Sequence, residues 1–279
     1  MQIQTRGGRK MVQFLTEDEP QRGVAVEIVP GIRRMVADNP SKMTYRGTNT
    51  YLIDTPDGTL IVDPGPDLPA HIAAIRAEAG RVAGILATHS HVDHVQSIPA
   101  LQVGLDVPVY ALGSRVAADI ALAEGAGLHG WRVLHTPGHI DDHICLLRED
   151  GVMLTGDHVM GWSSSVVIPP EGDMADYMGS LSRLLDENSG LYLPGHGPAI
   201  TEPHGYVRAL LAHRHGREAE VRACLADGVG AVEAMVARIY PDLAPQLMPM
   251  AARNVTAHLL KLAKDGLARA ESGGWVSAA

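Results

Sequence analysis

The sequence has few cysteines, the residues that cross-link a chain through disulfide bonds. Its 279 residues include only two cysteines, Cys145 and Cys224, which lie far apart in unrelated contexts. A disulfide framework needs several patterned cysteines, so it is excluded, and reduced thiols in the cytoplasm are expected instead. A single phenylalanine, beside 30 glycines and many alanines and valines, predicts a core of small aliphatic side chains.

Long hydrophobic runs and an excess of positive charge are also absent. No apolar stretch approaches the roughly 18–20 residues that span a bilayer, so no membrane association is expected. Residues 1–14 are basic but lack the apolar segment of a secretory signal, and either Met1 or Met11 could be the natural start. The net charge of −9 argues against a general polyanion binder, because phosphate contacts dominate nucleic-acid affinity.

The chain does contain enough apolar residues for a large core. A hydrophobic fraction of 46% over 279 residues predicts one large domain or a large-plus-small pair. From about residue 24 to 204, short β-rich runs alternate with helical stretches, which is typical of a layered α/β fold. Within it, a hairpin is expected over 48–65 with Asp57-Gly58 at its turn, and a helix over 69–80. Residues 1–23 are predicted to be a partly disordered N-terminal extension.

Over residues 205–279 the alternation of strands and helices gives way to a mainly helical pattern. Three stretches have helical periodicity: 205–228, 230–243 and 250–270. A small hairpin around 272–274 is expected to follow them. This order predicts a winged-helix-like module. The module carries 9 basic and 7 acidic residues, a net charge of +2, which leaves 14 basic and 25 acidic residues, or −11, for residues 1–204.

One short segment, ATHSHVDHV at residues 87–95, concentrates side chains that bind metals. His89, His91 and Asp93 recur with a period of two, so an extended segment projects them to one side. His94 follows where the chain is expected to turn into a helix. Neutral imidazoles and carboxylates suit Zn²⁺, which takes about four ligands. The segment offers ligands to two neighbouring ions but cannot complete either set, so further ligands must come from elsewhere.

Three later segments contain those ligands. His139 in TPGHIDDH, Asp157 in LTGDHV and His196 in LPGHGP each follow a predicted strand and have a glycine beside the ligand. Glycine allows the backbone to turn sharply or to approach closely at such a point. Two sets of donors and one carboxylate able to bridge them predict a dinuclear metal site.

The HxHxDH segment, followed in order by His139, Asp157 and His196, resembles the metallo-β-lactamase-fold hydrolase superfamily. GTNTYLI (47–53), TPGHIDDH (136–143) and the helical C-terminal extension narrow the likeness to a β-lactamase-like-protein-2 or glyoxalase-II-like branch. The resemblance covers about residues 24–270. It implies a four-layer αββα sandwich as the catalytic domain over 24–204 and a small winged-helix-like domain over 205–279.

The resemblance also implies how the ligands divide. One metal takes His89, His91 and His139. The other takes Asp93, His94 and His196, and the Asp157 carboxylate bridges the two. The expected metals are two Zn²⁺, with Fe or Mn as alternatives. A bridging hydroxide is the expected nucleophile, because metal binding lowers the pKa of water toward about 7. Asp93 and Asp157 are therefore the candidate catalytic residues.

Five residues beside these segments are candidate substrate contacts, with a plain structural role as the alternative for each. His158 directly follows the bridging carboxylate. The other four lie in predicted loops: Asn49, Tyr45, Trp162 and Ser164. Asp142 and His143 are expected to orient His139 or cap a turn rather than to react.

Two hydrolytic reactions fit this set of residues. The first is hydrolysis of a thioester or other acyl substrate, as in glyoxalase-II-like enzymes and acyl-carrier-protein thioesterases. The second is cleavage of single-stranded RNA, as in the branch that the chain resembles. The acidic catalytic domain favours the first and the branch resemblance favours the second, so both stay open. A small-molecule or acyl-thioester substrate is expected, with RNA contact and a homodimer as further alternatives.

Three other functions are disfavoured. A dedicated β-lactamase is disfavoured because Asp157 as the bridging carboxylate resembles other branches. A flavodiiron oxidoreductase is disfavoured because that family has Glu where His91 stands. A non-catalytic nucleic-acid-binding regulator is disfavoured because the C-terminal module has a net charge of only +2 and few aromatic residues for base stacking.

Overall fold

A computed structural model of the protein describes residues 5–6, 9–10 and 12–278. Both residues considered as the natural start, Met1 and Met11, lie outside the described residues. A short hairpin near the N-terminus pairs β1 (Thr5–Arg6) with β2 (Arg9–Lys10). Part of the predicted extension packs on the body of the protein, since the Leu15 amide donates a 2.8 Å hydrogen bond to the Gly161 carbonyl.

The larger of two facing sheets has seven strands in sequence order. They are β3 (Val26–Val29), β4 (Ile32–Val36), β5 (Asn49–Thr55), β6 (Gly58–Val62), β7 (Val82–Leu86), β8 (Val109–Leu112) and β9 (Ile120–Leu122). Pairing is antiparallel from β3 to β6 and parallel from β6 to β9. The first five residues of β5 are all buried, as expected for a strand covered on both faces.

The second sheet has five strands, again in sequence order. They are β10 (Gly127–Leu128), β11 (Trp131–His135), β12 (Ile144–Arg148), β13 (Val152–Gly156) and β14 (Leu191–Pro194). Pairing is antiparallel up to β13, and β13 pairs with β14 in parallel. The carboxyl ends of β13 and β14 therefore lie at the same edge of the sheet, where Asp157 and His196 follow.

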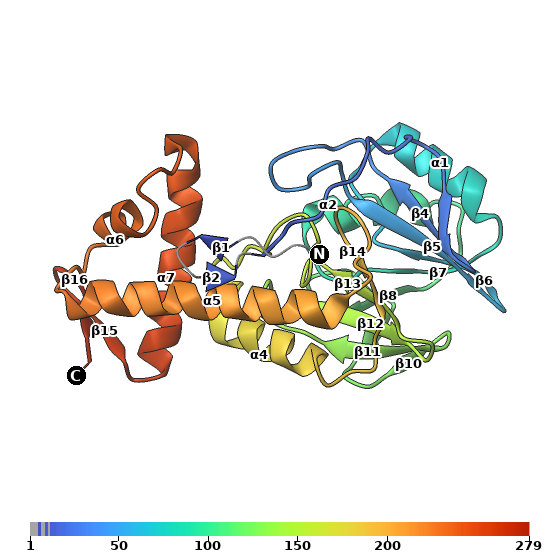
Figure 1. Cartoon of the computed structure of the whole chain (residues 1–279). Helices are drawn as coiled ribbons and strands as arrows, with labels where there is room; N and C mark the ends of the chain where they lie inside the picture. Colours follow the sequence, from blue (N-terminus) through green and yellow to red (C-terminus); the bar gives the residue numbers. More distant parts are fainter. Residues whose placement is uncertain (1–4, 7–8, 11, 279) are drawn as a thin grey trace.

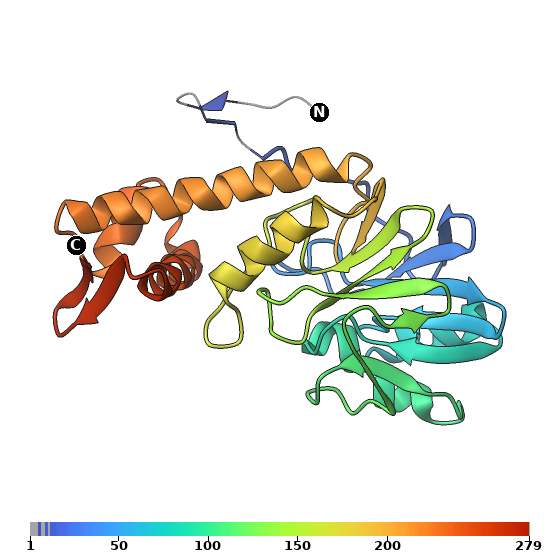
Figure 2. The same cartoon turned by 90° about the horizontal axis from the view of Figure 1, so that it is seen from below.

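Helices cover the outer face of each sheet, which gives the four layers αββα (Figures 1 and 2). Aliphatic residues of both sheets fill the space between them, among them Leu60, Leu86 and Leu146. On one side lie α1 (Pro69–Ala79), α2 (Val92–Val95) and α3 (Ile98–Gln102). On the other side lie α4 (Met174–Leu184) and α5 (Pro203–Ala226).

The C-terminal module has its own apolar core, which includes Met235, Val255 and Leu259. Its elements are α6 (Val232–Ile239), the 3₁₀ turn η1 (Pro245–Leu247), α7 (Met248–Lys264), β15 (Ala268–Glu271) and β16 (Gly274–Ser277). In Figure 1, α5 runs from beside α4 out to this module. The predicted boundary between residues 204 and 205 thus falls in the first turn of a continuous helix.

The four-layer fold and the small C-terminal module confirm the fold class predicted from the sequence, but one turn differs. Thr55 pairs with Gly58, so the two-residue hairpin loop is Pro56-Asp57 and not Asp57-Gly58. Gly58 opens β6 at a φ of 126°, a left-handed value that glycine adopts without strain. No helix in the described part of the chain is long and apolar enough to cross a membrane.

Candidate metal centre

The seven predicted ligands gather beyond the ends of four strands, which come from both sheets. His89 and His91 follow β7, and Asp93 and His94 lie in the short helix α2. The other three follow β11, β13 and β14: His139, Asp157 and His196. Side chains separated by more than a hundred residues are thus brought into contact.

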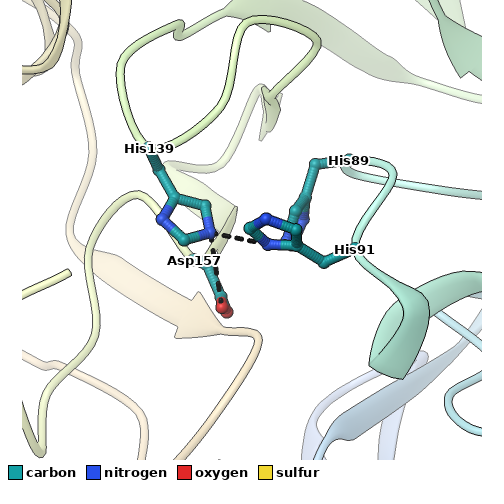
Figure 3. A group of neighbouring side chains, drawn as sticks. All are labelled: His89, His91, His139 and Asp157. Carbon is teal, nitrogen blue, oxygen red and sulfur yellow. Dashed lines mark hydrogen bonds and ion pairs between the residues drawn. The ribbon is translucent and has the colours of Figure 1, made fainter. Parts of the chain in front are cut away.

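The first group of donors consists of three imidazoles and a carboxylate (Figure 3). His91 Nδ1 lies 3.0 Å from His89 Nε2 and 2.9 Å from His139 Nε2. Asp157 Oδ2 lies 3.8 Å from His139 Nε2. One donor atom from each residue lies within 4.8 Å of the others, a spacing that suits ligands around a common ion.

The second group is Asp93, His94 and His196. Asp93 Oδ2 lies 3.2 Å from His196 Nε2 and 3.6 Å from His94 Nε2, and the two imidazole nitrogens are 3.3 Å apart. Asp157 also contacts this group, with Oδ1 3.6 Å from His94 Nε2 and Oδ2 3.4 Å from His196 Nε2. The Asp157 carboxylate therefore lies between the two groups.

The hydrogen bonds around the rings fit a cation at the centre. His139 Nδ1 donates to the Val166 carbonyl at 2.6 Å, and His196 Nδ1 donates to the Gly47 carbonyl at 3.2 Å. A carbonyl oxygen only accepts, so both rings carry a proton on Nδ1 and direct Nε2 inward, where a neutral imidazole offers its lone pair to a cation. Asp157 Oδ1 is buried and has no hydrogen-bond partner in the described part of the chain. Converging lone pairs beside an unsatisfied carboxylate oxygen are the donor set that a divalent cation needs.

Burial and charge divide the rings into two kinds. Burial lowers the pKa of His139 to about 4 and holds that of His89 well below its usual value, so these rings are neutral at pH 7. Burial also opposes protonation of His196, but the Asp157 and Asp93 carboxylates outweigh it and raise its pKa to about 9. Burial alone would raise the pKa of Asp93, whereas His94 and His196 lower it to about 2. Without a cation, the second group thus holds protons that a metal would displace.

A cleft of about 770 Å³ opens onto these donors. Three charged side chains also lie on its wall, namely Arg115, Glu171 and Arg253. The remaining wall residues are Met43, Ser90, His91, Val92, Asp93, His139, Ile140, Asp157, Val166, Ile168 and His196. The wall therefore combines the candidate ligands with an apolar portion.

The five predicted substrate contacts lie elsewhere. His158 is fully buried and packs edge-on to Tyr177, with ring centroids 5.0 Å apart. The Asn49 amide donates to the Pro194 and Gly197 carbonyls and so ties β5 to the loop that carries His196. Tyr45 and Trp162 stack on each other at 5.2 Å, and Ser164 is half-buried. None of the five is on the cleft wall described above, so their contact with substrate stays a prediction.

Two residues expected to orient His139 act on other groups. The Asp142 carboxylate accepts a long hydrogen bond, 3.4 Å, from the Ser90 amide, and His143 Nε2 accepts one from the Asp157 amide at 3.1 Å. The expectation for His139 was therefore wrong, because the Val166 carbonyl holds that ring. Backbone carbonyls from a distant loop leave no signal in the sequence.

One buried acid was missed altogether. Asp63 follows β6, is 1% exposed, and its Oδ2 lies 2.9 Å from His94 Nδ1. The same carboxylate accepts hydrogen bonds from the amide and the hydroxyl of Thr88, both at 2.7 Å. In the segment VDPG at 62–65, an acid follows a predicted strand and lies near a glycine, as Asp157 does. The sequence therefore contained a signal for Asp63.

Comparison with known families and proteins agrees with this geometry. Residues 43–118 match the model of the metallo-beta-lactamase superfamily, and residues 231–275 match that of the beta-lactamase associated winged helix domain. The beta-lactamase-like protein 2 homolog of Drosophila melanogaster is 32% identical over 87% of this chain and 91% of its own length. The atrochrysone carboxyl ACP thioesterase of Claviceps purpurea is 31% identical, covering 75% of this chain and 70% of that protein.

Solved structures are similar as well. A beta-lactamase domain protein from Burkholderia ambifaria superimposes with a TM-score of 0.81 at 26% identity, covering 92% of this chain and 94% of that one. A structure described as a di-iron-bound form has a TM-score of 0.51 and 30% identity, over 58% of this chain and 92% of its own.

Proposed function

This chain belongs to the metallo-beta-lactamase superfamily of hydrolases, and we propose that it hydrolyses thioesters at a centre that holds two divalent metal ions. The observation that carries the proposal is the Asp157 carboxylate, which lies between two separate groups of donors. We propose zinc as the metal, with iron or manganese as alternatives. The likeness to a protein described as a di-iron form supports keeping iron among them.

Three features support a thioester as the bond. Relatives from Claviceps purpurea and Aspergillus chevalieri, 31% and 34% identical to this chain, are named ACP thioesterases. The apolar part of the cleft wall, which includes Ile140, Val166 and Ile168, suits an acyl chain. The net charge of −11 over residues 1–204 disfavours a long polyanion such as RNA.

The residues of the two groups have separate roles. His89, His91 and His139 would hold one ion, Asp93, His94 and His196 the other, and Asp157 both. When bound, such ions polarise a carbonyl oxygen and lower the pKa of water.

Asp93 keeps 27% of its side chain exposed and lies on the cleft wall. Its carboxylate is therefore placed to accept a hydrogen bond from the attacking water and to orient it toward the carbonyl carbon. The carbon–sulfur bond then breaks, and the products are a carboxylate, a thiol and a proton. A thiolate is a stable leaving group near neutral pH, so no acidic side chain has to protonate the departing sulfur.

A parallel assay of the metal-loaded protein tests this proposal. The substrates are lactoylglutathione, acyl thioesters of N-acetylcysteamine and coenzyme A, an aryl phosphodiester, single-stranded RNA and a chromogenic cephalosporin. We expect kcat/KM to be highest for a thioester, and Asp157→Asn to remove that activity while Asp150→Asn, in an exposed turn, retains it. Faster cleavage of RNA or of the cephalosporin would instead assign the alternative bond and overturn the proposal.

A further inference from the structure

The C-terminal module contributes one residue to the wall of the cleft. Arg253 in α7 is that residue, and every other wall residue precedes residue 197 in the chain. We propose that Arg253 binds an anionic group of the substrate, a carboxylate or a phosphate, at the mouth of the cleft. This inference rests on the proposed thioester hydrolysis and names the class of thioester that the site selects.

The part of α7 that carries Arg253 is held against the catalytic domain. Its neighbour Asn254 accepts a 3.1 Å hydrogen bond from Arg214 Nη1 in α5. The other terminal nitrogen of Arg214 donates to the Ser165 carbonyl, and the guanidinium lies 5.2 Å from the ring centroid of Tyr177 in α4. Arg214 is only 3% exposed, so this bridge is shielded from water. The helix position of Arg253 is thereby coupled to the loop next to Val166, which also lines the cleft.

A second contact fixes the far end of the same helix. Lys264 near the end of α7 pairs with Asp173, the residue whose carboxylate caps the first turn of α4. Lys261 pairs at 3.0 Å with Glu218 of α5. Contacts at both ends of α7 therefore hold the module in one place relative to the cleft, as a recognition residue requires.

The charges on the wall distinguish Arg253 from the other arginine. Arg115 pairs with Asp141 at 2.9 Å and with Glu171 at 3.2 Å, so its guanidinium is already engaged. Arg253 is exposed and has no hydrogen bond or ion pair to any residue that the structure describes. A guanidinium offers several N–H donors in a planar fork that matches a carboxylate or a phosphate. Arg253 is thus the cleft cation available to a ligand.

The anionic group can belong to either half of a thioester. It can be a carboxylate at the far end of the acyl chain or a phosphate on the carrier thiol, and both are bound by the same chemistry. Four substrates separate the two sources. They are the butyryl and glutaryl thioesters of N-acetylcysteamine, which has no phosphate, and the same two thioesters of coenzyme A.

The test compares the wild type with Arg253→Gln and Arg253→Lys on these four substrates. We expect Arg253→Gln to lower kcat/KM about fivefold on at least one anionic substrate, through KM, as for an exposed charge pair. Butyryl-N-acetylcysteamine, which is neutral, should be turned over as by the wild type. Arg253→Lys should restore most of the preference, and about 0.5 M salt should weaken it in the wild type. Arg222→Gln, an exposed arginine of α5 away from the cleft, is the matched control and should change nothing.

Two results would overturn the inference. One is an equal loss by Arg253→Gln on the neutral substrate, which would indicate a general structural effect. The other is no loss on any anionic substrate. If the wild type hydrolyses none of the four thioesters, the proposed function fails. The affinities of stable thioether analogues, measured by calorimetry for wild type and Arg253→Gln, then still decide whether Arg253 binds the anion.

Discussion

At the scale of single residues, the rings of the candidate metal centre are oriented by partners behind them. Asp63 holds His94, and the Val166 and Gly47 carbonyls hold His139 and His196. Asp63 also has a φ of 49°, a left-handed value that costs free energy in a residue other than glycine. The strained backbone at Asp63 therefore coincides with the carboxylate that orients a candidate ligand.

Replacing Asp63 tests this orienting role. Asp63→Asn removes the negative charge behind His94 and replaces one of the two oxygens that accept hydrogen bonds from Thr88 and His94. We expect the affinity for Zn²⁺ to fall by about 10-fold to 100-fold, as is typical for the partners behind metal-bound histidines. Competition with a chromophoric chelator measures this affinity. Asp54→Asn, at the exposed end of the neighbouring strand β5, is the control, and equal affinities for the two variants would contradict the assigned role.

A buried histidine that is not a candidate ligand is expected to make the free energy of unfolding depend on pH. His71 in α1 is 5% exposed and bonds to the Thr50 hydroxyl at 3.0 Å. Burial lowers its pKa to about 4, against about 6.5 in the unfolded chain. Between these two pH values the unfolded state binds more protons than the folded state. The stabilisation from the neutral ring, measured as free energy of unfolding, is therefore complete above pH 6.5 and is lost as the pH falls through 4.

The histidine's effect is measured by comparing variants at two pH values. We expect the wild type to lose about 2 kcal/mol more stability than His71→Gln between pH 7.5 and pH 5. Urea unfolding of both proteins in the same metal state gives this difference directly. His215→Gln, on an exposed part of α5, should behave as the wild type. Parallel losses in His71→Gln and the wild type would show that His71 is not responsible.

At the scale of secondary structure elements, the strands were predictable because their apolar runs are short and lead into loops that carry glycine or histidine. The runs over 82–86, 109–112 and 191–194 are strands as expected, and Gly80 ends α1 at a φ of 59°. The hairpin turn between β5 and β6 was predicted one residue too late. Aspartate followed by glycine is a strong turn signal, but pairing of Thr55 with Gly58 sets the register here.

The glycine after β14 is required by the close approach of this strand end to the centre. A methyl group at Gly195 would meet Asp157 Oδ1 and lie 2.8 Å from His94 Cε1. Gly195→Ala should therefore displace the Asp157 carboxylate and lower both metal content and activity by at least about tenfold. Gly190→Ala, at the other end of the same strand, meets nothing within 4 Å and is the matched control. Normal metal content in Gly195→Ala would show that the strand end can shift without harm.

At the scale of the whole molecule, the candidate ligands were predictable and the cleft wall was not. Most of the ligands lie in short segments in which a strand is followed by a glycine and a metal donor, and each such segment can be recognised from its own sequence. The wall depends on how distant parts pack. Arg253 reaches the cleft only because α7 docks against α5 and the loop at Ser165. His158 was a candidate substrate contact from its place beside Asp157, with a structural role as the alternative, and it is fully buried against Tyr177.

The division of the chain also involves the whole molecule. The apolar core of the C-terminal module is separate from the cores on either side of the sheets, yet α5 belongs to both parts. We propose residues 24–204 as the catalytic domain and residues 205–279 as the module. The homodimer and the contact of the module with RNA stay predictions.

The number of metal ions per chain tests the central claim, that the Asp157 carboxylate joins two groups of donors into one centre. Elemental analysis of the protein, loaded with Zn²⁺ and dialysed, should give two ions per chain for the wild type and for the control Asp150→Asn. Asp157→Asn, which loses the charge shared by both groups, should retain one ion or none. A wild-type protein that retains no transition metal after loading with zinc, iron or manganese would contradict the account, as would two ions in Asp157→Asn.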